Sequence, residues 1–476
     1  MSGALVMTHA GPEPMRPSKP FSVAGQRVVV VGGARSGLAA AMLLRSRGAH
    51  VVLSEARDTL QDIETLARAG LEVELGGHRP ETFAHADLIV TSPGVELRQP
   101  AIAAARAAGV PVIGELELAS RWLVGPIVAV TGTKGKSTTT TLVGRMLAEA
   151  GRRVLVGGNI GAPLSGQVEQ SGPDVVHVVE ASSFQLETTT TFHPAIAVFL
   201  NFSPDHLDRH VSVEAYAAAK ARIFANQVAG DHAVVNADDA VAVDLARHGS
   251  ATVVRFSATS RSDAEVGIEG SWIVGRTPHG EPVPLVPLSE VRLIGRHLLA
   301  DVVAAVAIAR LLGVPGPAMT RAVAEFTGLE HALEPVAVVN GVRFVNDSKA
   351  TNLDAARQAV ESFEAGLVVI LGGHFKGGDL SALVTSLERR GASAVLIGES
   401  APLFRGALEG RVRARDAATL EEAVQAAYEW AKPGGVVLLA PACASFDMFH
   451  DYAERGRAFK AEVARLAAAA RGSRER

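Results

Sequence analysis

The sequence predicts an α/β protein of three domains that are built on parallel sheets. Apolar, β-branched strands recur along the 476 residues, and a glycine-rich turn and a helical pattern follow them. Strands that alternate with helices form parallel sheets, which bind ligands at the carboxyl ends of their strands. The chain is also too long for one core. We predict a Rossmann-like N-terminal domain (21–122), a P-loop-type central domain (123–328) and a Rossmann-like C-terminal domain (329–476).

The composition is that of a folded globular protein, with 48% hydrophobic and 20% charged residues. A net charge of −4 gives no reason to expect nucleic-acid binding. The single cysteine, Cys443, excludes an internal disulfide and fits a reducing compartment. No apolar run reaches the length of a membrane span, and residues 1–20 lack an apolar signal region. We expect a disordered leader over 1–20, no membrane insertion, and a place in the cytoplasm.

In the first domain, a strand over 27–31 leads into a glycine turn over 32–37 and then a helix. The dinucleotide fingerprint G-x-G-x-x-G is incomplete because its second glycine is Ala34, so the turn supports a Rossmann-like sheet more than a particular cofactor. Glu55 follows the second strand, where such folds grip a ribose hydroxyl. A later strand ends in the turn 91–94, whose backbone can meet a ligand.

The central domain opens on a phosphate-binding pattern. A buried strand over 127–130 is followed by a glycine loop and a helix. Backbone N–H groups at the helix start would face an anion, Lys136 would add a charge, and Ser137 has the hydroxyl that holds magnesium in such loops. The usual first glycine is Val130, so the match is incomplete, and a chance Gly-Lys-Ser at a helix cap is the alternative. We interpret these residues as a nucleoside triphosphate site: Gly132, Thr133, Lys134, Gly135, Lys136, Ser137 and Thr138.

Further polar residues follow strands of the same sheet and can converge with this loop. Glu180 is either a magnesium ligand or an acid that favours a helix N-terminus. His206 suits a surface histidine beside Asp205, since histidine is an unusual magnesium ligand. Lys220 lies on an evident helix, where an ordinary solvated lysine is the default.

In the last domain, Asp347 and Lys349 follow a strand and are expected to face a cleft more than a core. Lys376 lies between glycines and is either a loop lysine or an anion contact. Cys443 lies in an apolar context without an obvious base, so a buried structural cysteine is the expected role.

Together these motifs resemble the Mur ligase family, and within it the branch that adds D-glutamate. The resemblance runs from about residue 21 to the C-terminus. Its carriers are the loop 132–138, Gly158–Gly161, Glu180–Leu186, Asp205–Arg209, the segment around Lys220, Asn346–Asn352 and Pro441–Ser445. The resemblance implies an ATP-dependent amide ligase of peptidoglycan precursor synthesis, which joins D-glutamate to UDP-N-acetylmuramoyl-L-alanine through an acyl phosphate.

The resemblance also implies residue roles. Ser137 and Glu180 would hold one magnesium ion and His206 a second, and Lys220 matches a lysine that the family carbamylates, which makes it a further metal-site residue. Lys136, Glu180, His206 and Lys220 would be catalytic, and Asp347 would join the loop residues in binding ATP. The implied substrate-binding residues are Glu55, Arg57, Gly94, Asn159, Ser182 and Ser183 for the uridine substrate, and Lys349, Thr351, Lys376, Ser445 and Phe446 for D-glutamate. A monomer is expected.

Three positions depart from the family pattern on the adenine side of the site. Ala332 replaces an expected arginine, while Leu298 and Asp301 replace asparagines. Arg296 or Arg343 is a hypothetical compensation for the missing arginine.

Two alternatives remain. One is a Mur-type ligase for a different amino acid; a folate-type ligase would lack the first domain, and a diaminopimelate ligase would need an arginine-bearing motif that we do not find. The other is a Rossmann oxidoreductase or nucleotide-binding regulator that uses NAD, against which Ala34 and the phosphate loop both argue.

Overall fold

The computed structural model describes residues 21–60, 63–206, 209–247, 249–259, 261, 263–293 and 295–472, with the backbone alone at 296, 471 and 472. The predicted leader, and residues 207–208 of the histidine motif, lie outside the described residues. The chain divides into two compact units, one running to Leu288 with Asp301–Ala322, the other holding Ser289–Ala300 and the chain from Val323. Each unit is described by itself.

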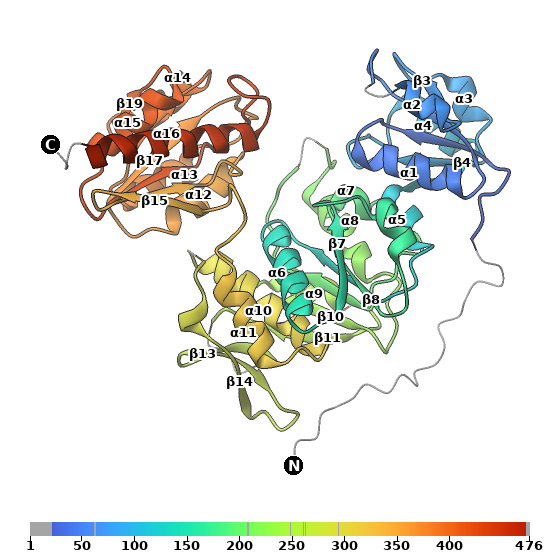
Figure 1. The fold of residues 1–476 in the computed structure, drawn as a ribbon, viewed down its shortest axis with the longest axis horizontal. Coiled ribbons are helices and arrows are strands. Elements are labelled where there is room, and N and C mark those ends of the chain that lie inside the picture. Colours follow the sequence, from blue (N-terminus) through green and yellow to red (C-terminus); the bar gives the residue numbers. More distant parts are fainter. Residues whose placement is uncertain are drawn as a thin grey trace. The chain divides into compact units, whose positions relative to one another are not determined.

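The first sheet is parallel, with the order β3-β2-β1-β4-β5 among the described strands. Figure 1 draws this domain in blue, with its helices α1–α4 labelled. Its central strand is apolar after Arg27, and Val28–Val31 are fully buried because helices cover both faces. The strands are β1 (Arg27–Val31), β2 (His50–Ser54), β3 (Glu72–Glu74), β4 (Leu88–Thr91) and β5 (Val112–Gly114). The helices are α1 (Arg35–Ser46), α2 (Ile63–Arg68), α3 (Pro80–Ala84), α4 (Pro100–Ala107) and α5 (Glu115–Ser120). The predicted Rossmann-like domain is confirmed.

The second sheet has the order β14-β13-β12-β11-β10-β9-β6-β8-β7 among the described strands. Its strands are β6 (Ile127–Thr131), β7 (Arg153–Gly158), β8 (Val175–Glu180), β9 (Ile196–Phe199), β10 (His232–Asn236), β11 (Thr252–Phe256), β12 (Val266–Glu269), β13 (Trp272–Arg276) and β14 (Pro282–Pro287). β13 pairs antiparallel with both β12 and β14, so this end of the sheet is an antiparallel extension of the parallel part. β6 lies between β9 and β8, so the phosphate loop leaves the middle of the parallel part.

Helices and short turns connect these strands. They are α6 (Lys136–Glu149), η1 (Leu164–Gln170), α7 (Ser183–Leu186), α8 (Val213–Ala221), η2 (Arg222–Phe224), α9 (Ala240–Ala246), η3 (Leu288–Glu290), α10 (Arg296–Leu311) and α11 (Gly316–Glu325). Among the described helices, none combines the length and apolarity that crossing a membrane requires.

The third sheet has the order β15-β16-β20-β17-β18-β19 among the described strands, with only β15 antiparallel. Its strands are β15 (Glu334–Val339), β16 (Val342–Asn346), β17 (Leu367–Gly372), β18 (Ser393–Ile397), β19 (Arg413–Asp416) and β20 (Val436–Leu439). The helices are α12 (Leu353–Glu361), α13 (Ser381–Arg389), α14 (Ala401–Leu408), α15 (Leu420–Trp430) and α16 (Tyr452–Gly472).

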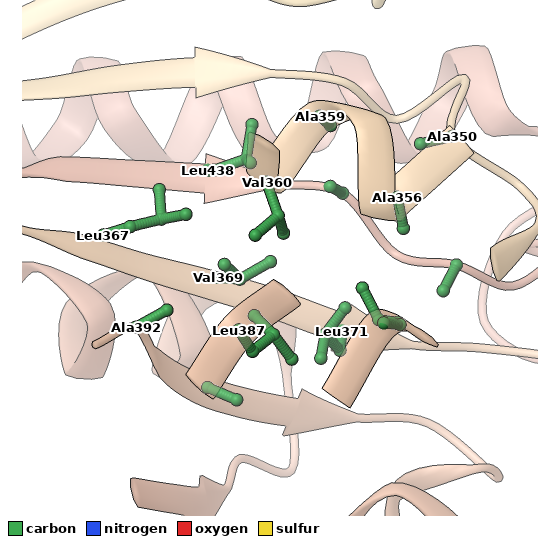
Figure 2. Close-up of a cluster of buried hydrophobic side chains, with 14 of the residues drawn as sticks. Ala350, Ala356, Ala359, Val360, Leu367, Val369, Leu371, Leu387, Ala392 and Leu438 are labelled. Carbon is green, nitrogen blue, oxygen red and sulfur yellow. The ribbon is translucent and has the colours of Figure 1, made fainter. Parts of the chain in front are cut away.

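An apolar core fixes the strands of this third sheet beneath their loops. Figure 2 shows Val360 of α12 pointing toward Val369 of β17 and Leu438 of β20, with Leu387 of α13 against the same layer. These side chains are at most 2% exposed. They are small or branched and interdigitate in a close-packed core. The loops at the carboxyl ends of these strands therefore start from a rigid base.

Candidate functional site

The predicted phosphate loop has the strand–loop–helix context that its sequence requires. β6 ends at Thr131 and α6 begins at Lys136, with Gly132 at φ +151° and Gly135 at φ +81°. A Cβ on Gly135 would overlap the carboxylate of Asp301, so glycine is required there for space as well as for φ. The loop backbone is pinned to the end of β9, since Thr133 N donates to Asn201 O at 3.0 Å and Lys134 N to Asn201 Oδ1 at 2.8 Å.

Two lysine ammonium groups meet at this loop. Lys136 Nζ donates to Gly132 O at 2.9 Å and to Thr133 O at 3.0 Å, and Lys220 Nζ donates to Gly132 O at 2.7 Å. Lys220 is only 1% exposed, so the solvated helix lysine that its local sequence suggests is wrong. Burial first, and the nearby Lys136 charge second, hold the pKa of Lys220 well below its ordinary value, although Asp205 and Glu180 oppose the shift.

Glu180 ends β8 directly beside the loop strand, because it is the register partner of Val130. Its side chain is buried, and Oε1 accepts a hydrogen bond from Asn159 Nδ2 at 2.8 Å. Its Oε2 is buried without a hydrogen-bond partner among the described residues. A buried carboxylate oxygen that lacks a donor suits a hard cation, and Ser137 lies in the first turn of α6. This geometry favours the magnesium alternative for Glu180 over a helix-terminal acid.

His206 lies on an irregular turn at φ +55°, with its side chain 48% exposed. Its ring contacts those of Phe184 and Tyr216, at centroid distances of 5.0 and 6.2 Å, and Tyr216 Oη lies 3.3 Å from Thr133 Oγ1. The expected convergence of the loop, Glu180 and His206 is thus present. In the described part of the chain, no group of three or more His, Cys, Asp and Glu side chains could hold a metal ion. A cation at this site would need hydroxyl, water or phosphate ligands as well.

The uridine-side candidates lie at strand ends of the first sheet. Glu55 accepts hydrogen bonds from Gly33 N at 2.7 Å, Arg57 N at 3.0 Å and Arg57 Nη2 at 3.0 Å. The Arg57 guanidinium lowers the pKa of Glu55 to about 2, so this carboxylate is charged at neutral pH. Gly94 lies in the turn after β4, and no other group lies within 4 Å of its would-be Cβ, so the turn is open to a ligand.

The remaining substrate-binding candidates of the central domain, Ser182 and Ser183, lie at the start of α7. Ser182 caps α7 in a reciprocal capping box with Gln185. Ser183 Oγ lies 3.0 Å from His210 Nε2, and both residues are buried. A narrow cleft near Ser183 is lined by groups of the first and central domains, among them Ser92, Val95, Phe184 and Glu187.

The residues predicted to bind D-glutamate, together with Asp347, form the acceptor loops, which follow three neighbouring strands of the third sheet. The Asp347–Thr351 loop follows β16, the Lys376 loop follows β17, and the Ser445–Phe446 loop follows β20. The loops are bonded to one another: Ala442 N donates to Ala350 O at 2.9 Å, and a β-bridge joins His374 to Ala444. Lys349, Lys376 and Phe446 are exposed, whereas Ser445 is buried. The structure therefore brings these six residues to one edge of one sheet.

Sequence patterns missed residues that hold these loops. Arg455 of α16 is 1% exposed and donates through Nη2 to Ser348 O at 2.9 Å and to Cys443 O at 3.1 Å. Burial lowers its pKa to about 10, although the charges of Cys443 and Asp447 oppose the shift. Cys443 is buried as expected, with its pKa raised to about 11 by burial. Arg455, Asn201 and Tyr216 carry no local sequence signal, because their partners come from distant segments.

The departures from the family pattern have structural consequences. Asp301 is buried against the phosphate loop with Oδ2 unpartnered among the described residues, and burial raises its pKa well above the usual value against the opposing charge of Lys136. Leu298 belongs to the core of the third domain. Arg343 is exposed at the second residue of β16, about 13 Å along the strand from Asp347, so it is poorly placed to compensate for Ala332. The side chain of Arg296 lies outside the described residues.

Family models match three consecutive parts of the chain. They are "Mur ligase MurD-like, N-terminal domain" over residues 26–114, "Mur ligase middle domain" over 130–309 and "Mur ligase, glutamate ligase domain" over 333–443. The UDP-N-acetylmuramoylalanine–D-glutamate ligase of Acidobacterium capsulatum is 48% identical over 441 residues, which cover 92% of this chain and 95% of that protein. The enzyme of that name from Koribacter versatilis is 44% identical, over 94% and 99% of the two chains.

Solved structures share the fold at lower identity. UDP-N-acetylmuramate–alanine ligase MurC of Thermotoga maritima aligns with a TM-score of 0.58 and 21% identity, over 93% of this chain and all of its own. MurF of the same organism, solved with ADP, aligns with a TM-score of 0.57 and 17% identity, over 94% and 96% of the two chains.

Proposed function

The chain belongs to the Mur ligase family, as a UDP-N-acetylmuramoylalanine–D-glutamate ligase of peptidoglycan synthesis, and on that premise we propose the roles of its residues. The family uses ATP. The observation that carries the proposal is the meeting of the phosphate loop, the unsatisfied Glu180 carboxylate and the buried Lys220 at the carboxyl edge of the central sheet.

The reaction has two steps. A carboxylate oxygen of the L-alanyl group attacks the γ-phosphorus of ATP, and the bond to the bridging oxygen breaks, which releases ADP. The D-glutamate amine then attacks the acyl carbon, and phosphate leaves with the oxygen that came from the alanyl carboxylate while the amine loses a proton. The loop backbone and Lys136 bind and orient the triphosphate at the start of α6, and Lys136 turns from its loop carbonyls toward the phosphates.

Magnesium fits beside Glu180, whose buried Oε2 lacks a donor among the described residues, and Ser137 would share the ion. When bound, magnesium offsets the negative charge that gathers on the transferring phosphoryl group. Asn159 keeps Glu180 oriented through its 2.8 Å hydrogen bond. The assignment of His206 to a second ion rests on the resemblance.

Lys220 is suited to carbamylation. An amine attacks CO₂ only when neutral, and burial favours the neutral form of Lys220. The product is a carbamate, which replaces a cation with an anion near Glu180 and so adds a carboxylate to the metal-binding region. Its present acceptor, Gly132 O, would then be released.

The two substrates are bound by residues of different domains. We propose that Glu55, Arg57 and Gly94 bind the uridine diphosphate, and that Asn159, Ser182 and Ser183 meet the muramoyl-alanyl arm. Asp347 binds the nucleotide, while Lys349, Thr351, Lys376, Ser445 and Phe446 position D-glutamate. The two lysines complement its carboxylates. We also propose that the enzyme is a cytoplasmic monomer.

Phosphate release tests this function. The purified chain is given ATP, magnesium and UDP-N-acetylmuramoyl-L-alanine together with D-glutamate, L-glutamate, other amino acids or none. Release that requires D-glutamate supports the proposal. Release that depends on a different amino acid would identify another Mur-type ligase, and release without any would contradict an amide ligase.

A further inference from the structure

Arg209 joins two loops that the proposed function assigns to different tasks. Its Nη2 donates to Val95 O, in the turn after β4 of the first sheet, at 2.8 Å. The same nitrogen donates to Glu187 Oε1, just after α7 of the central domain, at 3.0 Å. The Arg209 side chain is 12% exposed, so water screens these contacts little.

The guanidinium is also held by its face. Its carbon lies 5.3 Å from the centre of the Phe184 ring, and that ring stacks on His210 at 5.4 Å and meets His206 edge-on at 5.0 Å. One planar cation therefore contacts the turn that contains Gly94, the acid of the cleft and the aromatic ring against which His206 rests. A lysine ammonium lacks this flat face and fork.

The turn at Val95 has a second anchor, which defines what Arg209 adds. Ser92 Oγ donates to Gly32 O at 3.1 Å, and Val95 N donates to Ser92 O at 3.0 Å, so the start of the turn belongs to its own sheet. At the end of the turn, Val95 O accepts a hydrogen bond from Arg209, and no other described residue donates to it. Arg209 thus sets the position of the first-domain turn relative to the central-domain loop.

Charge gives this contact a second effect. Burial raises the pKa of Glu187, and the charges of Arg209 and Arg106 oppose that shift. An unpaired carboxylate in the cleft would repel the anionic uridine substrate. Arg209 neutralises Glu187 while it holds the turn.

We propose that Arg209 is a positioning residue that aligns the turn 92–95, which binds the uridine diphosphate, with the loop that carries His206. This inference rests on the proposed function, because the turn and the loop take their tasks from it. In this role Arg209 aligns the carboxylate of the bound uridine substrate with the phosphate loop.

The chain offers a matched control. Arg47 also links the two domains, with Nη2 2.8 Å from Glu169 Oε1 and its guanidinium 5.5 Å from the Trp122 ring centre, away from the candidate residues. Arg47→Met therefore removes an interdomain ion pair and a ring contact of the same kind. It should leave all Michaelis constants unchanged.

The experiment measures steady-state kinetics and thermal unfolding of Arg209→Met, Arg209→Lys, Glu187→Gln and Arg47→Met. For Arg209→Met we expect the KM for the uridine substrate to rise about tenfold and kcat to fall about tenfold or more, because a small misplacement of the reacting group is costly. The KM for ATP should stay unchanged, and Arg209→Lys should recover part of the loss.

The inference would be overturned if Arg209→Met and Arg47→Met changed kcat and KM equally, or if the KM values for the uridine substrate, ATP and D-glutamate all changed in parallel. Arg209 would then have only a structural role. If Arg209→Met does not fold, Arg209→Lys and Glu187→Gln decide through the same KM split, and no split in either would overturn it. Wild-type enzyme without D-glutamate-dependent activity would instead refute the proposed function.

Discussion

The phosphate site of the central domain and the acceptor loops of the C-terminal domain are built in opposite ways. At the phosphate site Lys220 and Glu180 are buried, and each is hydrogen-bonded to a fixed neighbour, Lys220 to Gly132 O and Glu180 to Asn159. At the acceptor loops the candidate side chains Lys349, Lys376 and Phe446 are exposed, and buried groups such as Arg455 hold only the backbone. The first region is organised before substrate arrives, while the second presents exposed side chains on a fixed frame.

The largest expected effect comes from the organised region. Lys136→Ala should lower kcat by about 10³-fold, because it removes a charge aimed at the transferring phosphoryl group. Phosphate release under saturating substrates measures the loss. Lys136→Arg keeps the charge but not the fit, and a fully active arginine variant would show that geometry at this position matters little.

Substitution of Lys220 tests whether this buried lysine is carbamylated and joins the metal site, or is an unmodified structural lysine. We expect Lys220→Met to lose about 10²-fold in kcat, and wild-type activity to fall reversibly when CO₂ and bicarbonate are removed. Because a lowered lysine pKa means more neutral amine, carbamylation should persist at lower pH than for an exposed lysine. Intact-mass and carbon-13 spectra would reveal the carbamate, and bicarbonate independence together with an unmodified Lys220 would argue against this role.

The acceptor loops should give a weaker and more selective effect. Lys376→Ala should raise the KM for D-glutamate about tenfold through loss of one charge-assisted contact, with the KM for ATP unchanged. Lys432→Ala is the control, since Lys432 is an equally exposed lysine at the opposite end of β20. If both variants behave alike, Lys376 is an ordinary loop lysine.

The smallest expected effect lies at Asp301, where the organised region departs from its family. Asp301→Asn should lower the KM for ATP severalfold, with a larger effect as pH rises through the Asp301 pKa, since ionised Asp301 repels the triphosphate. Its folded-state pKa is raised, so its contribution to wild-type stability is present at low pH and is lost as pH rises through that pKa. Thermal unfolding across pH should therefore show a decline in wild type that Asp301→Asn lacks; identical profiles would refute it.

The sequence predicted the parts of both regions that local patterns encode. The strands, the glycine loop at Gly132 and Gly135, and the acids at strand ends follow from periodicity and turn chemistry, and the structure confirms the three sheets. The burial of Lys220 could not be predicted from its own helix, because it depends on the packing of α8 beside the loop. The roles of Arg455 and Arg209 were missed for the same reason, since one acceptor of each, Ser348 O and Val95 O, lies over a hundred residues away in sequence.

The transfer of one oxygen atom tests the account most directly. UDP-N-acetylmuramoyl-L-alanine is prepared with oxygen-18 in its alanyl carboxylate, and the phosphate released with ATP is analysed with and without D-glutamate. Acyl-phosphate formation predicts one oxygen-18 atom per phosphate, released in quantity only with D-glutamate. Unlabelled phosphate, or labelled phosphate formed equally without D-glutamate, would contradict the account.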